Sequence, residues 1–348
     1  MQPSSESSQQ EGPTPIGDGK WMAWHLFNEE DLEGVLWEVV RPTVRELREQ
    51  GLIDSFFFIR YPEGGNHVRL RLRCAPRPEP EEVERRAGEV LTTFAGRWRP
   101  KPSARPGASA PLTPRRFPFE PEVERYGGEA LLPLSVDFFT LSSVDALRFV
   151  GVWSRQPRSR QLTDIMRRLL GQALGLARDW PEALSLLDYF AGRKQEMKPI
   201  LARADQTFEA NQEALAGAFR DNVRGWMEQG APVREPPVPE PLLLAEASRC
   251  LAAALVELEP AARESVKASQ MHMTANRLGL LNAEESYLTR LLCRSAGALE
   301  AREPHLLRAL DEWLRARQPP PQPAQRLATL LREELTRLPA PDEPGSPA

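Results

Sequence analysis

Three short segments carry the residues whose types and spacing could do chemistry, and the first is HVRLRLRC. Alternate side chains of a β-strand point to opposite faces, so basic and apolar residues separate here. One face would carry His67, Arg69, Arg71 and Arg73. A row of guanidinium groups can bind a carboxylate or phosphate through paired hydrogen bonds. The same alternation is also typical of a solvated strand face.

The second segment, EPEVERYGG, places Glu122 and Arg125 shortly before Gly127 and Gly128. A glycine pair allows the backbone to adopt positive φ angles and to come close to a bound group. Arg125 is therefore a candidate for binding an anion. An arginine beside acids is also common as a simple ion pair, and the pattern alone leaves both interpretations open.

The third segment, SQMHMTANRLGL, has the composition of a helix. Its residues Ser269, His272 and Asn276 follow the spacing i, i+3 and i+7, which predicts one shared helix face. A histidine on such a face could transfer a proton near neutral pH. A single helical histidine is, however, more often a structural residue.

The elements that must position these residues form two regions. Residues 21–27 predict a strand, residues 29–50 a helix that ends at Gly51, and SFFFIRY, PEGGN and HVRLRLRC a β-hairpin. From Gly128 onward the periodicity is helical, over 159–178, 181–191, 194–229, 241–258, 260–280, 283–299 and 303–317. We expect an α+β fold in which a small, mostly antiparallel sheet packs with a larger, predominantly helical portion.

Proline-rich stretches mark the expected boundaries. Residues 1–20 and 318–348 predict a flexible N-terminus and a largely flexible Pro-rich tail. A Pro-rich surface loop is expected at 99–118, and a break between helical regions at 231–241. The ordered domain is therefore expected to span 21–317.

The bulk composition narrows the class of protein. The chain has 348 residues, of which 41% are hydrophobic and 27% charged, as in soluble globular proteins. Neither a membrane span nor a secretory signal is evident, so we expect a cytoplasmic protein. A net charge of −4 argues against a nucleic-acid-coating surface. The three cysteines and four histidines follow no metal-binding spacing, and we expect no metal and no organic cofactor.

Taken together, WMAWHLF, RPTVRELREQGLIDSFFFIRYPEGGNHVRLRLR, EVERYGG and HMTANRLG resemble the C-terminal domain of lantibiotic dehydratases. This family is also called the thiopeptide-type bacteriocin biosynthesis domain. The resemblance runs from Trp21 to Leu280. In full-length members an N-terminal domain glutamylates Ser and Thr side chains using glutamyl-tRNA. The C-terminal domain then eliminates glutamate to leave dehydroalanine or dehydrobutyrine.

The resemblance implies functional residues. The family's arginines correspond to Arg69, Arg71 and Arg125, its acid to Glu122 and its histidine to His272. Arg71 and Arg125 would bind the glutamyl group with support from Arg69, and His67 and Asn276 would contact the substrate. His272 would transfer a proton, either to the departing carboxylate or from Cα. Phe119 departs from the tyrosine that is frequent in the family, which puts fine positioning in doubt.

The resemblance also implies partners. No glutamylation domain is recognised in the 348 residues, so we expect a separate glutamylating subunit, as in split dehydratases of thiopeptide pathways. The substrate would be a glutamylated precursor peptide. Because many relatives are dimers, a homodimer is the expected assembly.

Two other functions fit the sequence. Relatives of this size include enzymes that join two dehydroalanines in a formal [4+2] cycloaddition to form the pyridine of thiopeptides. Retention of the Arg, Glu and His set favours elimination over this reaction. A non-catalytic accessory subunit that binds the leader peptide through a hairpin edge is the third interpretation.

Overall fold

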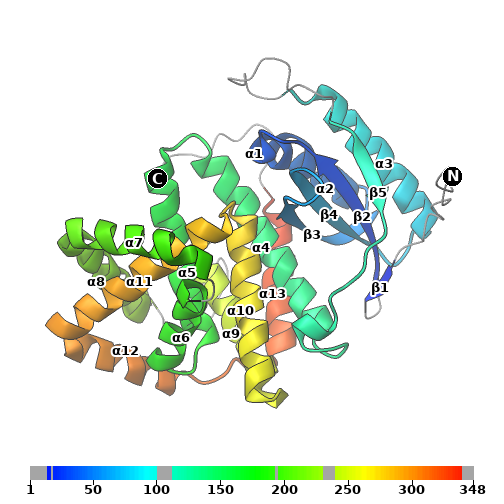
Figure 1. Ribbon diagram of the computed structural model, residues 1–348. Helices are drawn as coiled ribbons and strands as arrows, with labels where there is room; N and C mark the ends of the chain where they lie inside the picture. Colours follow the sequence, from blue (N-terminus) through cyan, green and yellow to red (C-terminus); the bar gives the residue numbers. More distant parts are fainter. Residues whose placement is uncertain (1–13, 17–18, 100–111, 193–194, 230–239, 339–348) are drawn as a thin grey trace, which may run out of the picture. The chain divides into compact units, whose positions relative to one another are not determined.

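The computed structural model describes residues 14–16, 19–99, 112–192, 195–229 and 240–338. Within these residues the chain divides into two compact units, one ending at Glu122 and the other running from Val123 to Leu338. Figure 1 shows that the described strands belong to the first unit and that long helices make up the second. The α+β class is therefore confirmed.

The first unit is built on an antiparallel sheet. Its described strands are β1 (Thr14–Ile16), β2 (Gly19–Phe27), β3 (Ile53–Tyr61), β4 (His67–Cys74) and β5 (Pro114–Phe117). They lie in the order β1-β2-β4-β3, and β5 also pairs with β2. The predicted hairpin is present as β3 and β4, with Tyr61 opposite His67. Gly64 and Gly65 in its turn have φ angles of 75° and 103°, which favour glycine.

Helices cover one face of this sheet. They are α1 (Leu32–Val35), the π-helical turn Leu36–Val40, α2 (Arg41–Glu49) and α3 (Pro80–Arg97). The helix predicted from residue 29 begins later, because the Asp31 side chain accepts a hydrogen bond from the Gly34 N–H (2.8 Å) and caps α1. Helix α3, which the sequence pattern did not predict, comes so close that a Cβ at Gly88 would lie 3.0 Å from the Trp24 ring.

The second unit begins with the short 3-10 turn η2 (Glu124–Tyr126). Its first helices are α4 (Leu132–Trp153), α5 (Arg158–Leu176), α6 (Trp180–Gly192), η3 (Gln195–Met197), α7 (Lys198–Ala210) and α8 (Gln212–Gln229). They are followed by α9 (Glu240–Ala254), η4 (Leu255–Glu257), α10 (Pro260–Arg277), α11 (Asn282–Arg302), α12 (Pro304–Ala316) and α13 (Pro323–Thr336). The helix predicted over 194–229 is interrupted because Asn211 leaves helical geometry (φ −132°).

Helix α10 lies among α4, α5 and α6, whereas α11 packs mainly against α6, α7 and α8. Helices α5 and α9 are in close contact at Gly175, where a Cβ would lie 2.4 Å from the backbone oxygen of Ala245. The second unit is thus a closely packed helical body in which α10 contacts η2, α4, α5 and α6.

Part of the chain expected to be flexible forms regular structure. Within 318–348, the residues of α13 bury Leu327, Leu330, Leu331 and Leu335, and the helix packs on α4 and α9. The expectation of a largely flexible tail is therefore wrong for 323–336, because one face of this segment is apolar enough to pack. Strands β1 and β5, and the start of β2, likewise lie in stretches expected to be flexible or looped.

Positions 1–13, 17–18, 100–111 and 339–348 of the stretches expected to be flexible lie outside the described residues, as does most of the predicted break at 231–241. Among the residues that the structure does describe, no helix is long and apolar enough to cross a bilayer. The same residues contain no cluster of three or more His, Cys, Asp or Glu side chains that could hold a metal ion.

Candidate functional site

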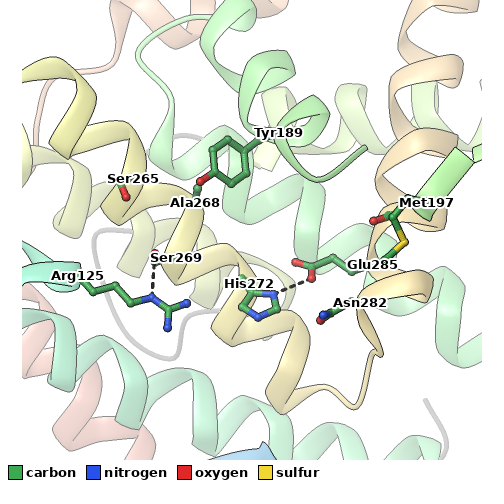
Figure 2. A pocket seen from close by; sticks show the side chains of 10 residues that line it. Arg125, Tyr189, Met197, Ser265, Ala268, Ser269, His272, Asn282 and Glu285 are labelled. Carbon is green, nitrogen blue, oxygen red and sulfur yellow. Dashed lines mark hydrogen bonds and ion pairs between the residues drawn. The ribbon is translucent and has the colours of Figure 1, made fainter. Parts of the chain in front are cut away.

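A pocket in the second unit brings together two of the three segments singled out in the sequence. It has a volume of about 390 Å³ and is enclosed by η2, α6, η3, α10 and α11. The side chains around it are drawn in Figure 2. The lining residues are Arg125, Tyr189, Met197, Ser265, Ala268, Ser269, His272, Asn282, Glu285 and Ser286.

One face of α10 forms a wall of this pocket. Ser265, Ser269 and His272 stand at helical spacing on that face, as the periodicity of SQMHMTANR predicted for the last two. The opposite face carries buried residues that pack into the helical body, including Lys267, Gln270 and Met271. Helix α10 is therefore held on its buried side while it presents a hydroxyl-rich face and one imidazole to the pocket.

The His272 imidazole is hydrogen-bonded to a carboxylate. Its Nδ1 lies 2.8 Å from Oε2 of Glu285, in the first turn of α11 (Figure 2). The side chain of His272 is 30% exposed, whereas that of Glu285 is only 5% exposed. Glu285 thus lies where the helix dipole places its positive end. An imidazole held in this way can exchange a proton through its other nitrogen.

Arg125 reaches the pocket from η2. Its Nε donates a hydrogen bond to Oγ of Ser269 (3.2 Å), which ties the guanidinium to the pocket face of α10 (Figure 2). The following residue, Tyr126, is buried against Phe139 of α4, with ring centroids 4.7 Å apart. Gly127 and Gly128 then adopt φ angles of 91° and 81°, so the chain can turn immediately into α4. The glycine pair thereby allows η2 to be followed by α4 within a few residues.

Two residues expected at the site do not line this pocket. Asn276 lies one turn beyond His272 on α10 but is not among the lining residues. Glu122 ends the first unit, and its side chain is exposed. The pocket therefore unites Arg125, Ser269 and His272 of the expected residues, and adds Glu285.

The remaining segment, HVRLRLRC, forms β4 in the sheet of the first unit. As predicted, His67, Arg69 and Arg71 share one face of β4, where His25 of β2 stands opposite Arg69. His67 accepts a hydrogen bond at Nε2 from Nε of Arg69 (3.1 Å), and its Nδ1 lies 2.7 Å from the Gly65 carbonyl oxygen. His67 and Arg71 are buried. Their burial shows that this is not the solvated strand face that the alternation also allowed.

Aromatic rings support these cations. The Arg69 guanidinium carbon lies 3.3 Å from the centre of the Tyr61 ring, and that of Arg71 lies 5.0 Å from Phe119. The ring of His25 stacks on Phe117 at 4.0 Å, with 13° between the planes. Phe119, where the family often has tyrosine, thus still provides an aromatic face for Arg71.

The electrostatic character of this sheet face is positive. Burial, and then Arg69 and Arg116, lower the pKa of Arg71 to about 9, so it remains charged at neutral pH. Burial, and then Arg71, His67 and Arg69, lower the pKa of His25 to about 3, and burial is also the main cause of the lowered pKa of His67. Neither Arg69 nor Arg71 forms an ion pair with a carboxylate among the described residues. The face can therefore bind an anion.

Sequence reasoning missed Glu285 and His25. Glu285 stands beside Glu284 in LNAEESY, and nothing in that string separates the glutamate that faces His272 from its neighbour. For His25 a signal existed, because the alternation of WMAWHLF places it on the same face as Trp21 and Ala23. The pocket of the second unit and the cationic face of the first are the two candidate sites.

Comparison with known proteins identifies a family model, "Lantibiotic biosynthesis dehydratase C-term", that matches residues 21–296. None of the curated proteins matches the chain in sequence. Among solved structures, the tRNA-dependent lantibiotic dehydratase MibB from Microbispora sp. 107891 is 22% identical, with a TM-score of 0.53. The aligned region covers 83% of this chain but only 29% of MibB.

Two further solved structures are similar over nearly their whole length. TsrL is 20% identical with a TM-score of 0.53, covering 86% of this chain and all (100%) of TsrL. The pyridine synthase TbtD from thiomuracin biosynthesis is 15% identical with a TM-score of 0.60, covering 81% of this chain and 98% of TbtD. At such identities the likeness concerns the fold.

Proposed function

Because the chain belongs to the lantibiotic biosynthesis dehydratase C-terminal family, we propose that it is a lyase that modifies a ribosomally made precursor peptide. It would eliminate glutamate from glutamylated Ser or Thr and leave dehydroalanine or dehydrobutyrine. The observation that carries this proposal is the pocket in which Arg125 and the His272–Glu285 pair face the same cavity.

The reaction makes two demands on a site. The Cα–H of a peptide residue is only weakly acidic, so a base must remove the proton while the developing negative charge is stabilised. The departing glutamate carries a further carboxylate and an amine, which must be held while the bond to Cβ breaks. A proton-transfer group beside a fixed cation meets both demands.

The pocket supplies these groups. His272 provides an imidazole that can transfer a proton near neutral pH. The guanidinium of Arg125 has the planar geometry that binds a carboxylate through two hydrogen bonds. Ser269 holds Arg125 in place through the 3.2 Å hydrogen bond to its Nε. Asn276 does not line the pocket, and we propose that it contacts a part of the substrate that extends out of the pocket.

The roles proposed for Arg69 and Arg71 rest on their own surroundings. Both belong to a positively charged sheet face, and neither of the two forms an ion pair with a carboxylate among the described residues, whereas Arg73 of the same strand pairs with Asp54. We assign Arg71 to binding the carboxylate of the glutamyl group, with Arg69 and His67 in support. Glu122 is assigned to the amine of that group or to holding an arginine.

The decisive test follows the mass of a Ser-containing peptide from the pathway's own precursor after it has been glutamylated chemically. The purified protein should release one glutamic acid per glutamylated serine. Arg125→Ala and Arg71→Ala should each lower kcat/KM by about 10²-fold, since each removes a charge that binds the substrate. Arg308→Ala, at an exposed position on α12, is the matched control and should retain full turnover. Normal turnover in both Arg125→Ala and Arg71→Ala would remove the assignment.

A pyridine-forming cyclisation is the second candidate. It is favoured by the likeness in fold to the pyridine synthase TbtD, with a TM-score of 0.60 over 81% of this chain. Its substrate would be a peptide that already contains dehydroalanine. Incubation with such a peptide would give a macrocycle with loss of water and of the leader peptide, while a glutamylated peptide would keep its mass.

A further inference from the structure

Two adjacent glutamates in the first turn of α11 have different partners. Glu284 accepts hydrogen bonds from Nη2 of Arg158 (2.8 and 2.9 Å) and from the backbone N–H of Leu281 (3.1 Å). Glu285 instead turns into the helical body, where its Oε2 lies 2.8 Å from Nδ1 of His272. Of the two carboxylates, only Glu285 lines the pocket.

We infer that Glu285 is the positioning residue of His272, which it holds with a proton on Nδ1 so that Nε2 acts as the base toward the Cα proton. The inference rests on the proposed elimination and names the group that removes the proton. An ionised carboxylate can only accept hydrogen bonds, so the ring nitrogen that faces it must be the donor. In a neutral imidazole the other nitrogen, Nε2, is then the acceptor.

His272 and Glu285 differ in exposure, and this difference indicates different roles for the two side chains. His272 is 30% exposed at the pocket, whereas Glu285 is 5% exposed. The second oxygen of Glu285, Oε1, is buried and has no hydrogen-bond partner among the described residues. A carboxylate enclosed in this way acts on the reaction through the imidazole. The same division of labour operates in hydrolases in which a buried carboxylate fixes the tautomer of a catalytic histidine.

The chemistry of the leaving group favours His272 as the base that removes the Cα proton, rather than as an acid that protonates the departing carboxylate. In the proposed step Nε2 takes the Cα proton, and the electron pair of that C–H bond forms the double bond to Cβ. The Cβ–O bond breaks, and its electron pair leaves on the glutamate carboxylate. This carboxylate is a weak base and departs without needing a proton. The imidazolium that forms lies beside the Glu285 carboxylate and returns its proton to solvent.

The tautomer can be measured without any substrate. The chain has four histidines, so ¹⁵N-labelled imidazoles give a small set of signals, and His272→Gln identifies that of His272. With the ring neutral, we expect the proton on Nδ1 in the wild-type protein. In Glu285→Leu the acceptor is gone, and the proton should move to Nε2. A wild-type neutral ring with its proton on Nε2 would overturn the inference.

Kinetics supply the second readout. With the glutamylated peptide, Glu285→Gln and Glu285→Leu should lower kcat by about 10²-fold and leave KM unchanged, because substrate binding is not touched. Glu300→Gln, the same change at an exposed position of α11, should keep the wild-type kcat. If the wild-type protein turns the peptide over and Glu285→Leu does so equally fast, the inference fails. If the wild-type protein releases no glutamate, the proposed function fails, and the ring tautomer still decides the role of Glu285.

Discussion

Two histidines of this protein have opposite surroundings, and the difference decides what each can do. His272 lies beside a carboxylate at a pocket and is partly exposed. His25 is buried between Phe117 and His67, with ring distances of 4.0 and 4.8 Å, and its cationic neighbours disfavour a second positive charge. The first has the surroundings that the proposed proton transfer requires, whereas the second stays neutral and keeps the charge of the sheet face on its arginines.

The buried His25 predicts a pH dependence of stability. Its pKa is lowered from 6.5 to about 3 in the folded protein. Between these values the unfolded chain binds a proton that the folded protein does not, so stability must fall as the pH is lowered. The loss for one such group is about 1.4 kcal/mol per pH unit below its unfolded pKa. The free energy of unfolding in urea, measured at about pH 7 and about pH 5.5, should therefore decrease by ~1 kcal/mol from this residue alone.

The control is His25→Phe, which keeps an aromatic ring beside Phe117 and removes the titration. A change in packing alters the unfolding free energy equally at both pH values. The quantity to compare is therefore the loss of unfolding free energy between the two pH values, in wild-type and in His25→Phe protein. His67, whose pKa is also lowered, remains in both proteins and contributes in the same direction. An identical loss of stability in wild-type and His25→Phe proteins would show that His25 does not carry the effect.

At the scale of elements, close contacts between helices hold the second unit together. The backbone oxygen of Ala245 on α9 would lie 2.4 Å from a Cβ at Gly175 on α5, and the Cβ of Ser248 2.8 Å from it. A backbone atom cannot move aside as a flexible side chain can. Gly175 is therefore required for the approach of two helices rather than for a turn.

Gly175→Ala should accordingly destabilise the protein by about 2 kcal/mol, within the range usual for overpacking. Gly297→Ala is the matched change, because Gly297 lies inside α11 with nothing within 4 Å of its would-be Cβ. There alanine should stabilise the helix by roughly 0.5–1 kcal/mol, since it restricts the unfolded chain. Thermal and urea unfolding will give the change in stability of each variant relative to the wild-type protein. Similar changes in the two variants would contradict the close contact at Gly175.

At the scale of the whole molecule, the chain returns near its C-terminal end to a helix formed almost 200 residues earlier. Glu334 of α13 is ion-paired with Arg148 of α4, where the side chains are 3% and 10% exposed. Arg148 also donates to the backbone oxygens of Glu334 (3.4 Å) and Arg337 (3.3 Å). Apolar packing of α13 against α4 and α9 surrounds this pair.

Glu334→Ala should cost about 3 kcal/mol of unfolding free energy, because it leaves the charge of Arg148, whose side chain is only 10% exposed, without its carboxylate. The double variant Arg148→Met with Glu334→Leu replaces the pair by apolar side chains and should recover most of that loss. Arg332→Ala, on the exposed side of α13, should change stability by less than about 0.5 kcal/mol. A neutral effect of Glu334→Ala would indicate that α13 contributes little to the folded unit.

Local patterns in the sequence predicted much of the fold and some of the residues of each candidate site. Alternation in HVRLRLRC placed His67, Arg69 and Arg71 on one face, and helical spacing placed Ser269 and His272 together. The hairpin and most of the helices of the second unit followed from the same periodicities. These features could be predicted because the direction of a side chain along a strand or helix is set by the backbone itself.

Other features were decided only by tertiary structure. The proline-rich composition of the C-terminal stretch hid the apolar face of α13, and β5 is a strand because it pairs with residues about 90 positions earlier in β2. Likewise, sequence could not reveal that Glu285 rather than Glu284 meets His272, nor that burial keeps His25 neutral. Periodicity assigns a residue to a face of its own element, whereas its partner and its exposure to water depend on packing between elements distant along the chain.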